Sequence, residues 1–245
     1  MKRCSTFISE GAGMFEIRDA NAGYKETLIV RHASLRVESG EIVALLGRNG
    51  VGKTTLMRYA MGLCRQIAGA VYLDGVPLPQ STSRRARLGL GYVPQGRHVF
   101  PRLTVSENIA AAAVACGYKP HDSITNVFRE FPILRPKADA LAVTLSGGQQ
   151  QALAIGRSLA MRPKVLLLDE PTEGIQPSIV DEIAGSLLRL NRQTGLALLI
   201  AEQNLDFCLS LAKRAYLMSG GTVVSTVPTE QLRTDKALLH DMLSV

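Results

Sequence analysis

Short apolar runs separated by turns occupy the first third of the chain. They are rich in aliphatic and β-branched residues and predict strands at 15–20, 28–37, 41–46 and 71–75. A helical pattern follows the third run, at Lys53–Met61. The runs at 41–46 (EIVALL) and 164–170 (KVLLLDE) are almost continuously apolar, which is typical of parallel strands buried on both faces. The pattern therefore predicts an α/β fold built on a mostly parallel sheet.

The middle of the chain has a different pattern. Between Thr104 and Arg162 the apolar positions follow helical spacing without a clear strand, which predicts a helical lobe beside the sheet. Residues 1–13 lack periodicity and are expected to form a flexible N-terminal extension. The rest of the chain predicts a helix at 178–193, a strand at 196–202, a helix at 205–213, strands at 215–220 and 222–227, and an amphipathic helix from Thr229.

Composition and charge add limited information. The 245 residues carry 28 Lys and Arg against 21 Asp and Glu, a formal net charge of +7. This excess suits a partner with phosphates or the face of a membrane, and equally a solvated basic surface. The four cysteines are too widely spaced to predict a metal cluster. The longest apolar run, 109–116, is far shorter than the roughly 20 residues that span a bilayer. We therefore expect a soluble chain in a reducing compartment, the cytoplasm.

A glycine-rich segment directly follows the strand at 41–46 and opens a helix. Residues 47–55 fit the pattern G-x-x-x-x-G-K-[ST], in which backbone N–H groups and the helix N-terminus surround phosphate oxygens. We expect Lys53 to reach the β- and γ-phosphates of a nucleotide and the Thr54 hydroxyl to bind Mg²⁺. An ordinary glycine-rich turn is the alternative, which the strand–loop–helix context disfavours. The predicted nucleotide-binding residues here are Gly47, Arg48, Asn49, Gly50, Val51, Gly52, Lys53, Thr54 and Thr55.

A pair of carboxylates ends the second apolar run. Asp169 and Glu170 follow four apolar residues, so they are expected at the end of a core strand rather than on a solvated surface. A carboxylate at such a strand end can hold Mg²⁺ beside a phosphate loop, and Asp169 suits that role. Glu170, one residue further, is placed to orient or deprotonate an attacking water and is, with Lys53, a predicted catalytic residue.

The segment LSGGQ, residues 145–149, lies between these two motifs. With the phosphate loop before it and VLLLDE after it, the chain resembles the ATP-binding subunit of an ABC transporter from about Phe15 to Val227. The resemblance implies ATP and Mg²⁺ as ligands, stacking of adenine on Tyr24, and sensing of Mg²⁺ and the γ-phosphate by Gln95. It also implies that two subunits pack head to tail, so that one subunit's signature residues contact the other's ATP. Those signature residues are Ser146, Gly147, Gly148 and Gln149.

The resemblance also predicts the domain organisation. It implies one ABC ATPase domain at 14–245, with a mostly parallel core sheet, an antiparallel β subdomain and an inserted helical subdomain at about 96–161.

Two positions depart from the family's pattern. The histidine that usually follows the next strand is replaced by Gln203, which can hydrogen-bond a γ-phosphate but cannot carry a proton near neutral pH. Gln203 is therefore included among the predicted catalytic residues. The loop after Glu170 reads Glu173-Gly174-Ile175-Gln176 in place of the usual Leu-Asp pair, which puts the inter-subunit contact of that aspartate in doubt.

The residues of several motifs narrow the resemblance to one subfamily. EGIQPSI and EQNLDF are similar to ATPases of branched-chain amino acid and amide importers, above all the urea-importer branch. The implied partners are a second, different ATPase subunit, two membrane-spanning permease subunits and, indirectly, a solute-binding protein, at the cytoplasmic face of the plasma membrane. The alternatives are an exporter ATPase, which its membrane partners would identify, and a soluble ABC ATPase acting on nucleic acid. The single phosphate loop and the lack of a heptad run disfavour the last, and no nucleic-acid partner is expected.

Overall fold

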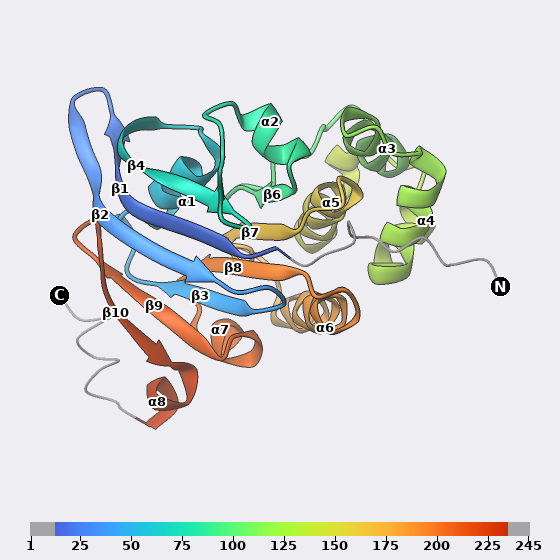
Figure 1. Ribbon diagram of the computed structural model, residues 1–245. Helices are drawn as coiled ribbons and strands as arrows, with labels where there is room; N and C mark the ends of the chain where they lie inside the picture. Colours follow the sequence, from blue (N-terminus) through green and yellow to red (C-terminus); the bar gives the residue numbers. More distant parts are fainter. Residues whose placement is uncertain (1–12, 235–245) are drawn as a thin grey trace.

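Two β-sheets form the centre of the molecule in the computed structural model, which describes residues 13–234 (Figure 1). The six-stranded core sheet has the order β10-β9-β3-β8-β7-β6. Each pair of adjacent strands in it runs parallel, except the pair β9 and β10, which is antiparallel. The fold is therefore α/β with a mostly parallel core sheet, as predicted. Its strands are β3 (Ile42–Leu46), β6 (Leu90–Val93), β7 (Val165–Asp169), β8 (Ala197–Glu202), β9 (Arg214–Ser219) and β10 (Thr222–Pro228).

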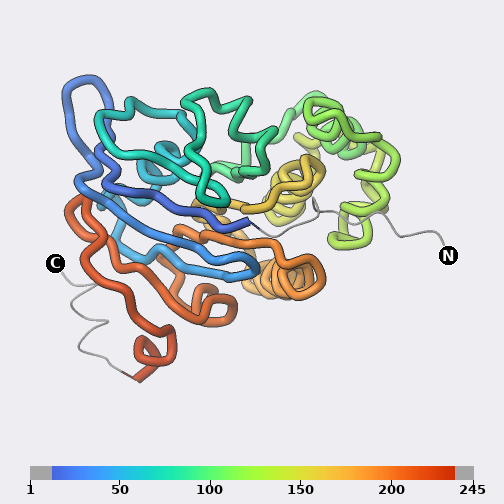
Figure 2. Tube along the Cα trace, viewed as in Figure 1, coloured from blue at the N-terminus to red at the C-terminus, as the bar shows by residue number. Residues whose placement is uncertain are grey.

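A smaller antiparallel sheet covers one side of the core sheet. Its order is β2-β1-β4-β5, formed by β1 (Phe15–Tyr24), β2 (Thr27–Val37), β4 (Arg65–Leu73) and β5 (Val76–Pro77). The backbone N–H of Arg31 in β2 donates to the Gly221 carbonyl, 2.8 Å away, beside β10. The blue strands from the start of the chain and the red strands from its end therefore lie side by side (Figure 2).

Alternate residues of the central strands enter two separate hydrophobic cores. In β3, Val43 and Leu45 pack with α1 and the antiparallel sheet, whereas Ala44 and Leu46 pack with helices on the opposite face. β7 and β8 divide their side chains in the same way. Since side chains of a strand point alternately to its two faces, burial on both sides requires the continuous apolar runs that the sequence shows.

The helices divide between the two faces of the core sheet and the side of the molecule. Helix α1 lies between the sheets, and α3 and α4 stand beside them (Figure 1). The helical elements are α1 (Lys53–Met61), α2 (Thr82–Arg87), α3 (Val105–Ala115), α4 (Pro120–Glu130), the 3₁₀ helices η1 (Pro132–Lys137) and η2 (Ala142–Thr144), α5 (Gly147–Ala160), α6 (Pro177–Thr194), α7 (Leu205–Leu211) and α8 (Thr229–Thr234).

Several elements differ from the sequence prediction. β4 begins at Arg65 rather than residue 71, because its first half is mostly exposed and lacks an alternating apolar pattern. β6 and α2 were not predicted, since the first is a four-residue edge strand and the second is one arginine-rich turn and a half. The extension predicted at 1–13 lies outside the described residues except for Gly13, and the C-terminal helix is described only to Thr234.

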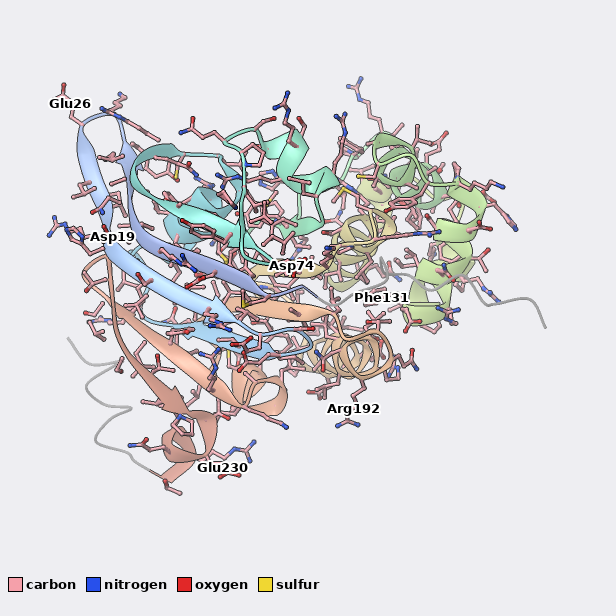
Figure 3. All side chains as sticks on the ribbon, in the orientation of Figure 1. Asp19, Glu26, Asp74, Phe131, Arg192 and Glu230 are labelled. Carbon is pink, nitrogen blue, oxygen red and sulfur yellow. The ribbon has the colours of Figure 1, made fainter. Side chains whose placement is uncertain are left out.

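The turn between β4 and β5 is tied to the core sheet by one carboxylate. Asp74, labelled in Figure 3, accepts a hydrogen bond from the backbone N–H of Met14 at 2.9 Å and from Lys164 Nζ at 2.7 Å. Lys164 directly precedes β7, so this pair joins the antiparallel sheet to the strand that ends at Asp169, just before Glu170. None of the helices within residues 13–234 is both long and apolar enough to cross a membrane.

A buried arginine fixes the C-terminal end of α1. Arg85 of α2 is 1% exposed, and its Nη1 donates to the carbonyl oxygens of Tyr59 at 2.8 Å and Ala60 at 2.6 Å. Its Nε donates to the Pro79 carbonyl. A cation at a helix C-terminus satisfies carbonyl groups that lack partners in the helix and complements the helix dipole. Arg85 therefore anchors the helix whose other end starts at Lys53.

We expect Arg85→Met to lower the free energy of unfolding by about 1.5–3 kcal/mol, because it removes charge-assisted hydrogen bonds to the carbonyl oxygens of Tyr59, Ala60 and Pro79. Denaturant unfolding of the full-length chain measures this. The control is Arg84→Met on the same helix, where the side chain is exposed and the change should stay within about 0.5 kcal/mol. Equal effects of the two substitutions would contradict the anchoring role.

Candidate nucleotide site

The site forms where three parallel strands end. Leu46 of β3 pairs with Glu202 of β8, and Ala201 of β8 pairs with Asp169 of β7. The chain segments that follow these strands therefore begin at one edge of the core sheet. In open α/β sheets this edge, beyond the carboxyl ends of the strands, is where ligands bind.

The phosphate loop, residues 47–52, joins β3 to α1. Gly47 must be glycine, because a Cβ atom there would lie 2.4 Å from the carbonyl oxygen of Met218. Gly52 has a φ of 110° and is the N-cap of α1. No side chain caps this helix and no acidic residue stands in its first turn. The helix N-terminus thus keeps the partial positive charge of its amides available for an anion.

Lys53 is a buried cation that folds back over the loop. Its side chain is 3% exposed, and Nζ donates to the carbonyl oxygens of Gly47 at 2.7 Å and Arg48 at 3.1 Å. Nζ also lies 3.6 Å from Glu170 Oε1. These contacts hold the ammonium group at the centre of the loop. The loop residues Arg48, Asn49 and Gly50 are exposed, and Thr55 is buried.

Thr54 and Asp169 bring oxygen ligands together. The Thr54 hydroxyl donates to Asp169 Oδ1 at 3.0 Å, and the Tyr92 hydroxyl donates to Oδ2 at 3.1 Å. Burial raises the pKa of Asp169, while these two donors act in the opposite direction. Mg²⁺ takes oxygen ligands and is held by one or two protein side chains together with substrate phosphates. This pair fits such an ion, and within residues 13–234 there is no cluster of three or more His, Cys, Asp or Glu for a metal cage.

Glu170 has an unusual backbone and a carboxylate held from two sides. Its φ is +47°, a left-handed conformation that non-glycine residues rarely adopt, and its N–H donates to the Ala201 carbonyl at 2.8 Å. Besides Lys53, the carboxylate contacts Gln95, whose Nε2 donates to Oε2 at 2.9 Å. Burial raises the pKa of Glu170, and Lys53 opposes that shift.

The loop at 173–176, which departs from the family pattern, contacts the Gln95 segment of the same chain. Gln95 Nε2 donates to Glu173 Oε2 at 3.1 Å. Arg97 Nη2 donates to the carbonyl oxygens of Glu173 at 3.2 Å and Gly174 at 3.3 Å. Glu173 therefore joins Gln95 and Glu170 in one hydrogen-bonded group.

Tyr24 reaches α1 through a residue that the sequence did not indicate. Tyr24 ends β1 and is 39% exposed, and Arg58 Nη1 donates to its hydroxyl at 3.1 Å. Arg58 lies one and a half turns into α1. This bond holds the ring beside the helix that begins at the phosphate loop while leaving part of the ring accessible.

The signature residues form the start of α5. The backbone N–H of Gln149 donates to Ser146 Oγ at 3.4 Å, and Gln149 Oε1 accepts from the Ser146 N–H at 3.1 Å, a reciprocal capping box. A Cβ at Gly148 would lie 2.5 Å from Ile179 Cγ2, and one at Gly147 would lie 3.0 Å from Arg97 Nη1. The glycines thus allow α6 and Arg97 to approach this turn closely.

Gln203 follows β8 and is exposed, whereas its neighbour Glu202 is buried.

Among the site residues predicted from sequence, hydrogen bonds or an ion pair connect Lys53, Thr54, Gln95, Asp169 and Glu170 into two adjoining groups. Sequence reasoning missed Arg58, Tyr92 and Glu202. Only Glu202 had a signal, since it follows an apolar strand as Asp169 does.

The fold and this site define an ATP-binding cassette ATPase. The family model described as ABC transporter matches residues 30–173. The branched-chain amino acid transport ATP-binding protein BraG of Pseudomonas aeruginosa is 39% identical over 82% of this chain and 87% of its own. The lipopolysaccharide export system ATP-binding protein LptB of Haemophilus influenzae is 38% identical over 87% of this chain and 90% of its own.

A crystal structure of a nucleotide-free ATP-binding cassette from an ABC transporter superposes with a TM-score of 0.82 at 22% identity, covering 95% of this chain and all of that one. This likeness confirms the fold. The chain belongs to the ABC transporter family. It is the ATP-binding subunit, an ATPase, and subunits of this class dimerise and act with membrane permease components.

Proposed function

We propose that the chain powers a membrane importer for urea, short-chain amides or branched-chain amino acids. The observation that carries the chemistry is the hydrogen-bonded arrangement of Thr54 with Asp169, beside Glu170 held between Lys53 and Gln95. The importer assignment is supported by the similarity to BraG, and by the EGIQPSI and EQNLDF segments for the urea branch.

ATP binding would place the triphosphate over the phosphate loop, where backbone N–H groups and the N-terminus of α1 face it. Lys53 would exchange its bonds to loop carbonyls for bonds to the β- and γ-phosphates. Thr54, Asp169 and Gln95 would hold Mg²⁺, which when bound neutralises charge on the phosphate oxygens. Tyr24 would stack on the adenine.

Hydrolysis would use the carboxylate of Glu170 as the group that orients water. Exchange of Lys53 toward the phosphates would release this carboxylate from its present ion pair. Gln203 would donate an amide hydrogen bond to the γ-phosphate. Ser146, Gly147, Gly148 and Gln149 would contact the ATP of a second subunit, since they lie at the N-terminus of α5 and a helix N-terminus favours an anion.

In the assembled transporter, the helical subdomain at about 96–161 within the ATPase domain at 14–245 would pass the closing and reopening of the dimer to two permease subunits. A second, different ATPase subunit would complete the dimer, and a solute-binding protein would deliver the solute. The chain would lie at the cytoplasmic face of the plasma membrane, with no nucleic-acid partner.

Reconstitution tests the transported solute. The permease subunits and the solute-binding protein encoded beside this chain are placed with it in proteoliposomes, and ATP-dependent uptake of urea, acetamide and leucine is measured. Uptake of one of these supports the proposal. The second candidate, an exporter subunit, is favoured by the similarity to LptB. ATP hydrolysis stimulated by the permeases without uptake, and outward movement of a lipidic substrate, would establish that alternative.

Substitution of Lys53 and Glu170 should have different effects. Lys53→Ala should weaken ATP binding by about 1.5–3 kcal/mol, because it removes a charge-assisted contact to the phosphates in the ground state. Glu170→Gln should leave ATP affinity nearly unchanged and lower turnover by about 100-fold to 10,000-fold. Nucleotide titration and steady-state hydrolysis in the assembled transporter separate the two. Wild-type turnover by Glu170→Gln would exclude its assigned role.

Tyr24→Ala should weaken ATP binding by about 1–3 kcal/mol, the scale for loss of an aromatic ring under a base. Tyr24→Phe should bind nearly as well as the wild type, because the ring face makes the contact and only the bond to Arg58 is lost. Nucleotide titration measures both variants. If Tyr24→Phe were as damaged as Tyr24→Ala, the hydroxyl and its arginine partner, rather than stacking, would account for the effect.

The isolated chain should be a weak, mostly monomeric ATPase, because the neutral amide of Gln203 stabilises γ-phosphate charge less than a polarised imidazole does. Full activity should require the paralogous subunit and the permeases. Steady-state hydrolysis by the purified chain and by the complex measures this, and Gln203→His should raise the activity of the chain alone. High turnover together with ATP-dependent homodimerisation of the isolated wild type would refute the expectation.

A further inference from the structure

The carboxylate of Glu202 accepts four hydrogen bonds from two separate segments. Oε1 accepts from the backbone N–H of Thr172 at 2.9 Å and from its hydroxyl at 2.6 Å. Oε2 accepts from the backbone N–H groups of Gln203 at 2.9 Å and Asn204 at 3.0 Å. The residue is 3% exposed. No ion pair to a lysine or arginine within residues 13–234 accompanies these bonds.

These bonds join the two segments assigned to γ-phosphate chemistry. Thr172 lies two residues after Glu170, and Gln203 directly follows Glu202. The backbone bond from Glu170 N–H to the Ala201 carbonyl adds a further link between them. The bond between Glu170 and Ala201 and the bonds between Thr172 and Glu202 therefore connect residues 170–172 to residues 201–204. The two segments meet although Thr172 and Glu202 are 30 residues apart in the chain.

The turn after Glu202 is also held from its far side. Asn204 Oδ1 accepts from the backbone N–H of Phe207 and so caps α7. Gln203 thus stands between a turn fixed by Glu202 and a helix fixed by Asn204. Its backbone position is determined while its exposed side chain is left outside this network.

A purely structural residue would not need this arrangement. Closing the turn from β8 to α7 requires only the two bonds on Oε2. The bonds on Oε1 reach across to the segment behind Glu170, and a buried carboxylate is costly unless several donors surround it. Bonds to an ionised acceptor are roughly twice as strong as neutral ones, so the carboxylate makes this link stiffer than an amide would.

We propose that Glu202 is a positioning residue for ATP hydrolysis, which sets Glu170 and Gln203 in a fixed arrangement relative to one another. The water-orienting carboxylate and the γ-phosphate-contacting amide then move as one unit. Glu202 acts through these two residues and does not itself contact ATP. The inference rests on the roles proposed above for Glu170 and Gln203.

The first test is Glu202→Gln in the full-length chain within the assembled transporter. The amide keeps the size of the side chain but turns an NH₂ group toward donors, so one side of the link is lost. We expect kcat to fall by about 10- to 100-fold, the range for a displaced reacting group, with the Kd and KM for ATP changed less than about twofold. The phosphate loop is untouched by the substitution, which is why binding should persist.

Thr172 provides a graded version of the same test. Thr172→Val removes only the hydroxyl bond to Oε1 and should lower kcat less than Glu202→Gln does. Thr172→Ser keeps the hydroxyl and should restore kcat to near the wild-type value. If only the packing of the Thr172 methyl group mattered, Thr172→Ser would not restore kcat.

The matched control is Glu41→Gln. Glu41 is a partly buried carboxylate whose oxygens accept from Arg214 Nε at 2.6 Å, Arg214 Nη2 at 2.8 Å and the Glu38 N–H at 2.9 Å. It precedes β3, at the end of the core sheet opposite to the nucleotide site. This substitution should lower Tm, as Glu202→Gln does, while leaving kcat unchanged.

A double-variant comparison decides whether Glu202 acts through Gln203. Because Glu202 acts on both Glu170 and Gln203, Glu202→Gln combined with Gln203→Ala should be slower than either single variant, but by less than the product of the two separate losses. Additive losses, an unchanged kcat in Glu202→Gln, or a loss of ATP affinity that accounts for its slower turnover would overturn the inference. Full turnover by Gln203→Ala and Glu170→Gln alone would instead overturn the proposed roles, and this inference with them. Reduced turnover in those two variants with normal turnover in Glu202→Gln would overturn this inference only.

Discussion

The parallel pairing of β3, β8 and β7 is the constraint on which the site depends. Because the three strands run in the same direction, the phosphate loop, the Asp169–Glu170 pair and the Glu202–Gln203 pair all leave the sheet at one edge. A shift in register by one residue would move Ala44 and Leu46 into the core that Val43 and Leu45 fill, so the fit of side chains in both cores opposes it. Packing of the two cores thus also fixes where β3, β7 and β8 end relative to one another, and with them the positions of the phosphate loop, Asp169–Glu170 and Glu202–Gln203.

Charge at this edge is balanced by short-range contacts that the nucleotide would replace. Lys53 is almost fully buried, and its positive charge is met by two carbonyl oxygens and by the carboxylate of Glu170. Glu170 in turn is held by Gln95, which also contacts Glu173. In the proposed function a triphosphate would compete for the same ammonium group, and its arrival would change the surroundings of Glu170 through Lys53. This coupling arises from adjacency and requires no displacement of the sheet.

The fold could be predicted from the sequence where burial on two faces leaves a continuous apolar run, as in β3 and β7. It could not be predicted where an element is short or exposed, as for β6 and the first half of β4. The phosphate loop was recognisable because its chemistry depends on residues close together in the chain. The bonds of Arg58 to Tyr24 and of Tyr92 to Asp169 depend on how distant segments meet, which spacing does not encode.

The signature turn, Ser146 to Gln149, is already formed within a single subunit. The side chains of Ser146 and Gln149 are engaged with each other's backbone, so the turn is preorganised before any ligand arrives. Gly148 leaves room for Ile179 of α6, because a Cβ atom there would lie 2.5 Å from Ile179 Cγ2. Arg97, which lies beside Gly147, binds the loop at 173–176, which contacts Gln95. A charge placed against this turn from outside would therefore act on a structure already linked to Glu170 of its own chain.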